Sequence, residues 1–111
     1  MAETFKSVTS AGIGTASTAI YTCPASTTAI VLGFLVANAT NPAADIAVSS
    51  TLTKSGGSAC HVIRGVNIFA GASLSISGEN NKLVLETGDA LAVSSDVASS
   101  ADVTLSILEI T

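Results

Sequence analysis

The chain has 111 residues, of which 48% are hydrophobic and 11% carry a charge, where an ordinary soluble domain has about a quarter of charged residues. The net charge is −4, and the four cationic residues, Lys6, Lys54, Arg64 and Lys82, are scattered, which excludes a basic surface for nucleic acid. The longest apolar stretch has nine residues, whereas a membrane-spanning helix needs about 20. We therefore expect one domain that binds neither nucleic acid nor a membrane.

Hydroxyl and methyl groups replace the missing charges. The sequence contains 16 Ser, 13 Thr and 18 Ala. These side chains lose little entropy and little hydration when another protein covers them. Such a surface favours a protein that works in contact with other proteins.

Short β-branched and apolar stretches, separated by Gly, Asn, Pro and Ser, predict an all-β protein. In chain order the expected strands are 4–9, 19–23, 29–37, 46–53, 59–64, 73–77, 83–85, 91–93 and 102–110. Eight or nine short strands predict an antiparallel two-sheet β-sandwich, of the jelly-roll or Ig-like kind.

Two hairpins are expected, one joining 46–53 to 59–64 across "KSGGS" and one joining 83–85 to 91–93 across "TGD". In the last strand the apolar side chains occupy odd positions as far as Ile107 and even positions from Leu108. This change of phase predicts either a bulge or burial of both faces.

The stretch "AIVLGFLVA", residues 29–37, has no polar side chain. Strict alternation gives one face with Ile30, Leu32, Phe34 and Val36, and another with Ala29, Val31, Gly33, Leu35 and Ala37. A sandwich strand turns only one face to the core, so the other face needs a cover. Either a loop folds over it, such as the N-terminal segment or "NATNPAADI", or a neighbouring subunit does.

The N-terminal segment 1–18, "MAETFKSVTSAGIGTAST", is the second region that we single out for interaction. It is either an ordinary first strand with a loop, or an arm that adds a strand to a neighbour. Residues 19–111 then form the sandwich domain. The two regions supply the interface candidates: Phe5, Ile13, Val31, Phe34 and Leu35.

The two cysteines, Cys23 and Cys60, are expected to act as independent small hydrophobic residues rather than as a disulfide. His61 follows Cys60 directly, and neighbours in a strand point to opposite faces. We therefore do not expect these two side chains to share a catalytic or metal site.

Turn residues account for the remaining polar groups. Four of them offer oxygens that Ca²⁺ accepts, at Glu79, Asn80, Asn81 and Asp89. Their spacing matches no known calcium loop, so ordinary turn chemistry is favoured. Carboxylates without a neighbouring base or nucleophile also flank turns, at Glu86, Asp89, Asp96 and Asp102. We expect no catalytic residue, cofactor or metal, and a protein that is not an enzyme.

Two segments, "IYTCPASTTAIVLGFLVANAT" and "NKLVLETGDALAVSSDVASSADVTLSILEIT", resemble small β-sandwich virion proteins of tailed bacteriophages. Cys23 departs from that pattern, which has Val in its place. The resemblance covers most of the chain from Ile20 onward. It implies a capsid decoration (cement) protein, made in the host cytoplasm and located on the capsid surface of the virion. Its implied partners are the major capsid protein and further copies of itself, with a trimer favoured.

Two other functions remain open from the sequence. The same resemblance fits a structural protein of the tail, neck or fibre. A carbohydrate-binding adhesion module on the virion is the third function considered, although only three Phe and one Tyr are available to stack on sugar rings.

Overall fold

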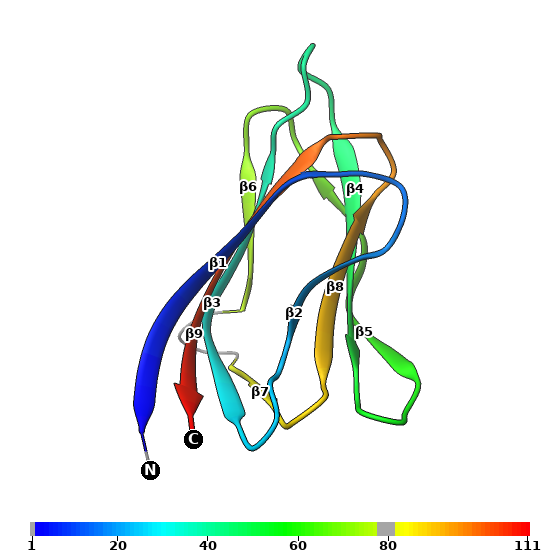
Figure 1. Ribbon diagram of the computed structural model, residues 1–111. Helices are drawn as coiled ribbons and strands as arrows, with labels where there is room; N and C mark the ends of the chain where they lie inside the picture. Colours follow the sequence, from blue (N-terminus) through cyan, green and yellow to red (C-terminus); the bar gives the residue numbers. More distant parts are fainter. Residues whose placement is uncertain (1, 78–81) are drawn as a thin grey trace.

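The computed structural model describes residues 2–77 and 82–111, and over these residues the chain forms strands and no helix (Figure 1). The nine strands are β1 Glu3–Ile13, β2 Thr18–Thr22, β3 Thr28–Asn38, β4 Ile46–Thr53, β5 Ala59–Ile68, β6 Ser73–Ser77, β7 Leu83–Leu85, β8 Ala90–Ser95 and β9 Ala101–Ile110. Within this described part, no helix is long and apolar enough to cross a lipid bilayer.

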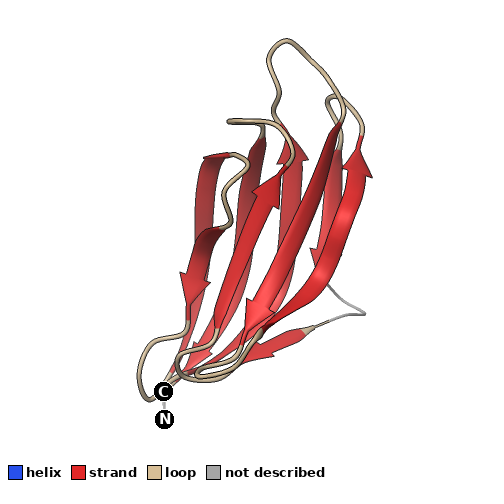
Figure 2. Cartoon of the chain, turned by 90° about the vertical axis from the view of Figure 1, so that its right-hand side faces the viewer, coloured by secondary structure: helices blue, strands red, loops and turns tan. Residues whose placement is uncertain are grey.

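The strands form two antiparallel sheets that lie in two layers (Figure 2). The first sheet has the order β1-β9-β3, and β3 then pairs with β7 along one part of its length and with β6 along another. The second sheet has the order β2-β8-β4-β5. The predicted all-β, two-sheet antiparallel sandwich is confirmed.

The first strand is longer than predicted. β1 pairs with β9 from Glu3 to Ser10 without interruption and rejoins it at Ile13 after a register shift. Gly12 lies in this shift with a φ of +70°, a conformation that Gly adopts without a steric cost. Its N–H donates to Oδ1 of Asp102 at 3.0 Å. Residues 10–13, which lie beyond the predicted strand 4–9, therefore continue β1 through a bulge, and the segment 1–18 contributes an edge strand to the domain's own sheet.

One predicted hairpin is confirmed and the other is wrong. β4 pairs with β5 as expected. β7 pairs instead with β3 in the first sheet, while β8 lies between β2 and β4 in the second. The turn at 86–89 therefore carries the chain from one sheet to the other. Its last two residues bond to Cys23: Gly88 N–H donates to the Cys23 carbonyl at 3.0 Å, and Cys23 N–H donates to the Asp89 carbonyl at 2.8 Å.

The two faces predicted for residues 29–37 are wrong because β3 contains a bulge. Its register against β9 shifts between Val31 and Gly33, so Leu32 is an extra residue. The core-facing residues are therefore Ala29 and Val31 before the bulge and Phe34 and Val36 after it, all of them buried.

The change of phase in the last strand does not reflect a bulge in β9. The odd positions of β9 from Ala101 to Glu109 are buried throughout, so β9 alternates regularly. Leu108 and Ile110 point to the other side of the sheet, where they are half-buried. Of the two outcomes predicted for this strand, a bulge is absent from β9, and at one end apolar residues lie on both of its faces, buried on the core side and half-buried on the outer side.

The core between the sheets is a single cluster of buried apolar side chains. Its largest fully buried members are Phe34, Ile46, Leu85, Leu91, Leu105 and Ile107. Ser50 takes a core-facing position of β4 and donates its hydroxyl to the Ala92 carbonyl at 2.9 Å. Each buried side-chain nitrogen and oxygen of the described residues has a hydrogen-bond partner. Because these side chains fill the space between the sheets, the alternate residues of each strand lie on the two outer faces.

Candidate functional site

A row of apolar side chains crosses the outer face of the first sheet. Phe5 of β1 stands opposite Leu108 of β9, Leu108 stands opposite Ile30 of β3, and Ile30 stands opposite Val84 of β7. Directly opposite residues of antiparallel strands project from the same face. These four residues, Phe5, Leu108, Ile30 and Val84, are called the outer apolar row below.

The two ends of the outer apolar row are the most exposed. Phe5 is 75% exposed and Val84 is 52% exposed, while Ile30 and Leu108 are half-buried between their neighbours. Leu35, on the same face of β3, is 46% exposed. No described segment of the chain covers these side chains. Exposed apolar patches of this kind mark binding surfaces in soluble proteins.

Hydroxyl groups line the same face beside the apolar row. Ser7 of β1 stands opposite Ser106 of β9, and Thr9 stands opposite Thr104. These cross-strand pairs carry no charge, so a partner that covers them removes little bound water. The apolar row and the hydroxyl rows together form an uncharged surface that is easily desolvated.

The outer face of the second sheet is different in kind. The outward positions of its two central strands, β4 and β8, are Ala47, Ser49, Thr51, Thr53, Ala90, Ala92 and Ser94. None of these side chains is a large apolar one. The contrast singles out the first sheet as the side of the sandwich that is suited to bury apolar area in a complex.

The structure separates the five predicted interface residues into two groups. Ile13, Val31 and Phe34 are buried in the core, so a partner of the folded monomer cannot reach them. Phe5 and Leu35 are exposed on the outer face of the first sheet, and their contact with a partner stays a prediction. The sequence reasoning missed Ile30, Leu108 and Val84. The signal for Leu108 was present in the even-numbered apolar positions at the end of the chain.

No family model, curated protein or solved structure matches the chain.

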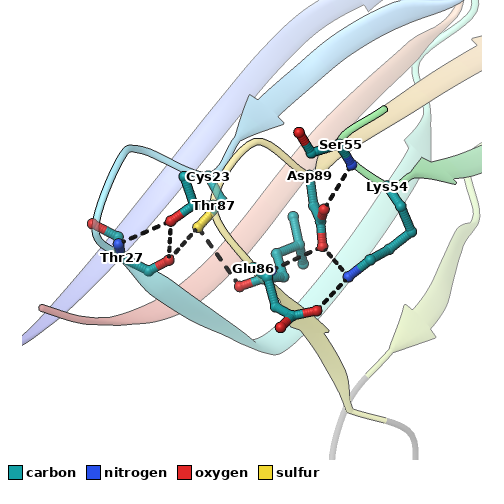
Figure 3. Close-up of polar contacts among 8 residues, drawn as sticks. Cys23, Thr27, Lys54, Ser55, Glu86, Thr87 and Asp89 are labelled. Carbon is teal, nitrogen blue, oxygen red and sulfur yellow. Dashed lines mark hydrogen bonds and ion pairs between the residues drawn. The ribbon is translucent and has the colours of Figure 1, made fainter. Parts of the chain in front are cut away.

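A buried carboxylate ties together the turns at one end of the sandwich (Figure 3). Asp89 is buried, and its side chain accepts the N–H of Ser55 at 3.0 Å and the N–H of Glu86 at 2.9 Å. The Lys54 ammonium donates to the same carboxylate and to Oε1 of Glu86, the latter at 2.7 Å. The hydrogen bond from Lys54, followed by that from the Glu86 N–H, lowers the pKa of Asp89 to about 2. Asp89 is therefore a buried structural residue, whereas the sequence placed it only among the carboxylates that flank turns.

The thiol of Cys23 lies beside this cluster and is held by backbone acceptors (Figure 3). Its Sγ donates to the carbonyls of Thr27 and Leu85 at 3.2 and 3.6 Å. Burial raises the pKa of the thiol, which keeps it protonated. Cys23 is therefore a core residue with a satisfied thiol, and it is not a nucleophile.

A second polar cluster joins the two sheets near the chain termini. Tyr21 of β2 donates its hydroxyl to Oε2 of Glu109 in β9 at 2.6 Å, and Lys6 Nζ lies 3.3 Å from Oε1 of Glu109. The hydrogen bond from Tyr21 lowers the pKa of Glu109, although burial opposes this effect. Burial and the same hydrogen bond raise the pKa of Tyr21. The three side chains satisfy one another's hydrogen-bonding groups, and none of the three is free for acid–base chemistry.

Among the described residues, those considered for metal binding or catalysis form no metal or catalytic site. Cys60 and His61 are both exposed, and their register partners Leu52 and Thr51 place them on opposite faces of β5, as predicted. Both cysteines are free thiols. Residues 79–81 of the calcium hypothesis lie outside the described residues. Over residues 2–77 and 82–111 there is no group of three His, Cys, Asp or Glu side chains suited to a metal, and no pocket.

Proposed function

We propose that this protein decorates a bacteriophage capsid, where it binds the major capsid protein through the outer face of its first sheet. The observation that carries the proposal is the outer apolar row, which exposes Phe5 and Val84 on the outer face of the first sheet. The resemblance to small virion proteins of tailed phages supports the choice of partner. In this proposal the protein is not an enzyme, and its place is on the capsid surface of the virion.

The composition of the surface fits attachment to a lattice of repeated sites. Ser and Thr around the apolar row make weak contacts at a low desolvation cost. A capsid repeats its binding sites many times, so an oligomer that engages several of them gains affinity from each weak contact. Such a protein needs a firm scaffold and a flat face rather than a pocket.

Cosedimentation tests this proposal. The purified protein is mixed with expanded heads of the phage that encodes it and, separately, with purified tails. Saturable binding to heads, at a ratio set by the lattice, is the expected result. Binding to tails alone would reassign the protein to the tail, neck or fibre, and binding to neither would reject a structural role on the virion.

Two variants test whether the outer apolar row is the binding surface. Val84→Asp places a charge in the row and is expected to weaken binding to heads by at least about tenfold. Thr51→Asp places the same charge on the outer face of the second sheet and is the matched control, expected to bind like the unmodified protein. Equal losses in both variants would reject the outer apolar row as the binding surface.

A further inference from the structure

The two open sheets have four edges, and one of them differs from the others. β2 has five residues. β6 and β7, which share the edge beside β3, have five and three residues. β5 is longer, but its register against β4 shifts twice and Gly65 interrupts it with a φ of +61°. β1 has eleven residues and runs beside β9 without a register shift from Glu3 to Ser10. Among the described strands, β1 is thus the longest regular edge.

Natural sheets protect such an edge with prolines, bulges or charged side chains. β1 contains no proline, and its bulge at Gly12 lies beyond the regular part. Its only charged residues are Glu3 and Lys6, and Lys6 is already paired with Glu109 of the same chain. Residues 2–7 are all exposed, and in Figure 1 this half of β1 extends away from the second sheet. The edge is therefore open to a further strand.

The outer apolar row ends on this edge at Phe5, its most exposed member. A strand that pairs with β1 and carries an apolar residue opposite Phe5 would extend the row. A second copy of β1 meets this requirement. When two identical edge strands pair antiparallel around a two-fold axis, residues that face outward in one copy stand opposite residues that face outward in the other.

We propose that two copies of the protein pair through β1, antiparallel, with Phe5 opposite Phe5. The outer apolar rows of the two copies then meet end to end and form one strip across a continuous sheet. In this register Lys6 stands opposite Thr4, and Glu3 stands opposite Ser7, so no like charges are directly opposed. The pairing is two-fold, and it therefore gives a dimer rather than the trimer expected from the sequence resemblance.

Sedimentation equilibrium of the untagged protein over a concentration series tests the pairing. A reversible monomer–dimer equilibrium is expected. Phe5→Asp places two carboxylates face to face and is expected to raise the dissociation constant by at least about tenfold. Phe69→Asp is the matched control, because Phe69 is 68% exposed but lies in the β5–β6 turn, and this variant is expected to dimerise normally.

Disulfide crosslinking tests the register. In a Cys60→Ser background, Phe5→Cys is expected to form a covalent dimer on oxidation, because directly opposite residues are within reach of a disulfide. Ser7→Cys is expected not to do so, since Ser7 stands opposite Glu3 of the other copy. Crosslinking at residue 7 instead of residue 5 would overturn the proposed register.

Three further outcomes would overturn the pairing itself. If the protein is a monomer at every concentration, the β1 edge pairs with a strand of another protein rather than with a second copy. A trimer, or a dimer that is unaffected by Phe5→Asp, would place the contact between copies elsewhere. None of these measurements uses phage particles, so this proposal and capsid decoration can fail independently.

Discussion

Phe34 and Leu35 are neighbours in β3 with opposite environments, because one faces the core and the other faces outward. Phe34→Ala removes a fully buried aromatic ring and is expected to lower the free energy of unfolding by about 3–5 kcal/mol. Leu35→Ala removes a side chain that is 46% exposed, and the expected change is within about 0.5 kcal/mol. Urea unfolding of both variants measures the difference. Similar losses would mean that the bulge at Leu32 does not set the two faces of β3 in solution.

The sequence contained only part of the information about these two residues. The apolar stretch 29–37 predicted a strand correctly, because it is short and bounded on both sides by turn residues. Its two faces could not be predicted, since a bulge shifts the alternation by one residue and Gly33 is a weak marker of it. Gly33 has an ordinary φ, and a Cβ there would meet only Ser106 at 4.0 Å, so the bulge does not require Gly. The pairing of β3 with β9 decides which residues of β3 face the core.

At the scale of whole elements, the Asp89 carboxylate holds together the turns before β5 and after β7, while the Asp89 backbone carbonyl accepts the N–H of Cys23. Its pKa of about 2 lies below the ordinary value of 3.8. Between these two values the unfolded chain binds the proton and the folded chain does not, so stability rises with pH. We expect the contribution of Asp89 to be fully present above pH 3.8 and lost as the pH falls towards 2.

Asp89→Asn tests this contribution. The amide keeps the shape but not the charge, so the variant is expected to be less stable at neutral pH and to lose less stability between pH 4 and pH 2. Lys54→Met is the complementary variant. Without the ammonium the pKa of Asp89 is expected to rise, and acid unfolding should begin at a higher pH. Thermal unfolding of both variants across this pH range measures these changes. If the stability of each variant falls with decreasing pH in parallel with that of the unmodified protein, Asp89 is not the group responsible.

The strand content of the fold could be predicted from local patterns, but the assignment of strands to sheets could not. The β4–β5 hairpin follows from a short Gly-rich tip between two strands. β7 and β8 are also separated by a short turn, and the sequence pattern is that of a hairpin. The turn crosses between the sheets instead, because its residues bond to Cys23, Lys54 and Ser55. Those partners are more than 30 residues away in sequence, beyond what a local pattern reports.

For the molecule as a whole, the polar cluster of Tyr21, Glu109 and Lys6 joins the two layers at the end where β1 extends past the second sheet. Tyr21 belongs to the second sheet, and Glu109 and Lys6 belong to the first. Glu109 is buried, so each of its oxygens needs a donor. Tyr21 is the only donor that reaches it from the opposite layer among the described residues.

Tyr21→Phe removes that donor and leaves a buried carboxylate oxygen without a partner. The free energy of unfolding is expected to fall by about 1–3 kcal/mol. Lys6→Gln is the matched comparison, and because the Lys6 side chain is half exposed, it is expected to cost less, about 0–1 kcal/mol. Since Tyr21 lowers the pKa of Glu109, the deficit of Tyr21→Phe should be greatest at neutral pH and should shrink as acid protonates Glu109. Urea unfolding at neutral and at acid pH measures this dependence. A larger loss of unfolding free energy for Lys6→Gln than for Tyr21→Phe would mean that Glu109 stabilises the attachment of β1 more than the contact between the two layers.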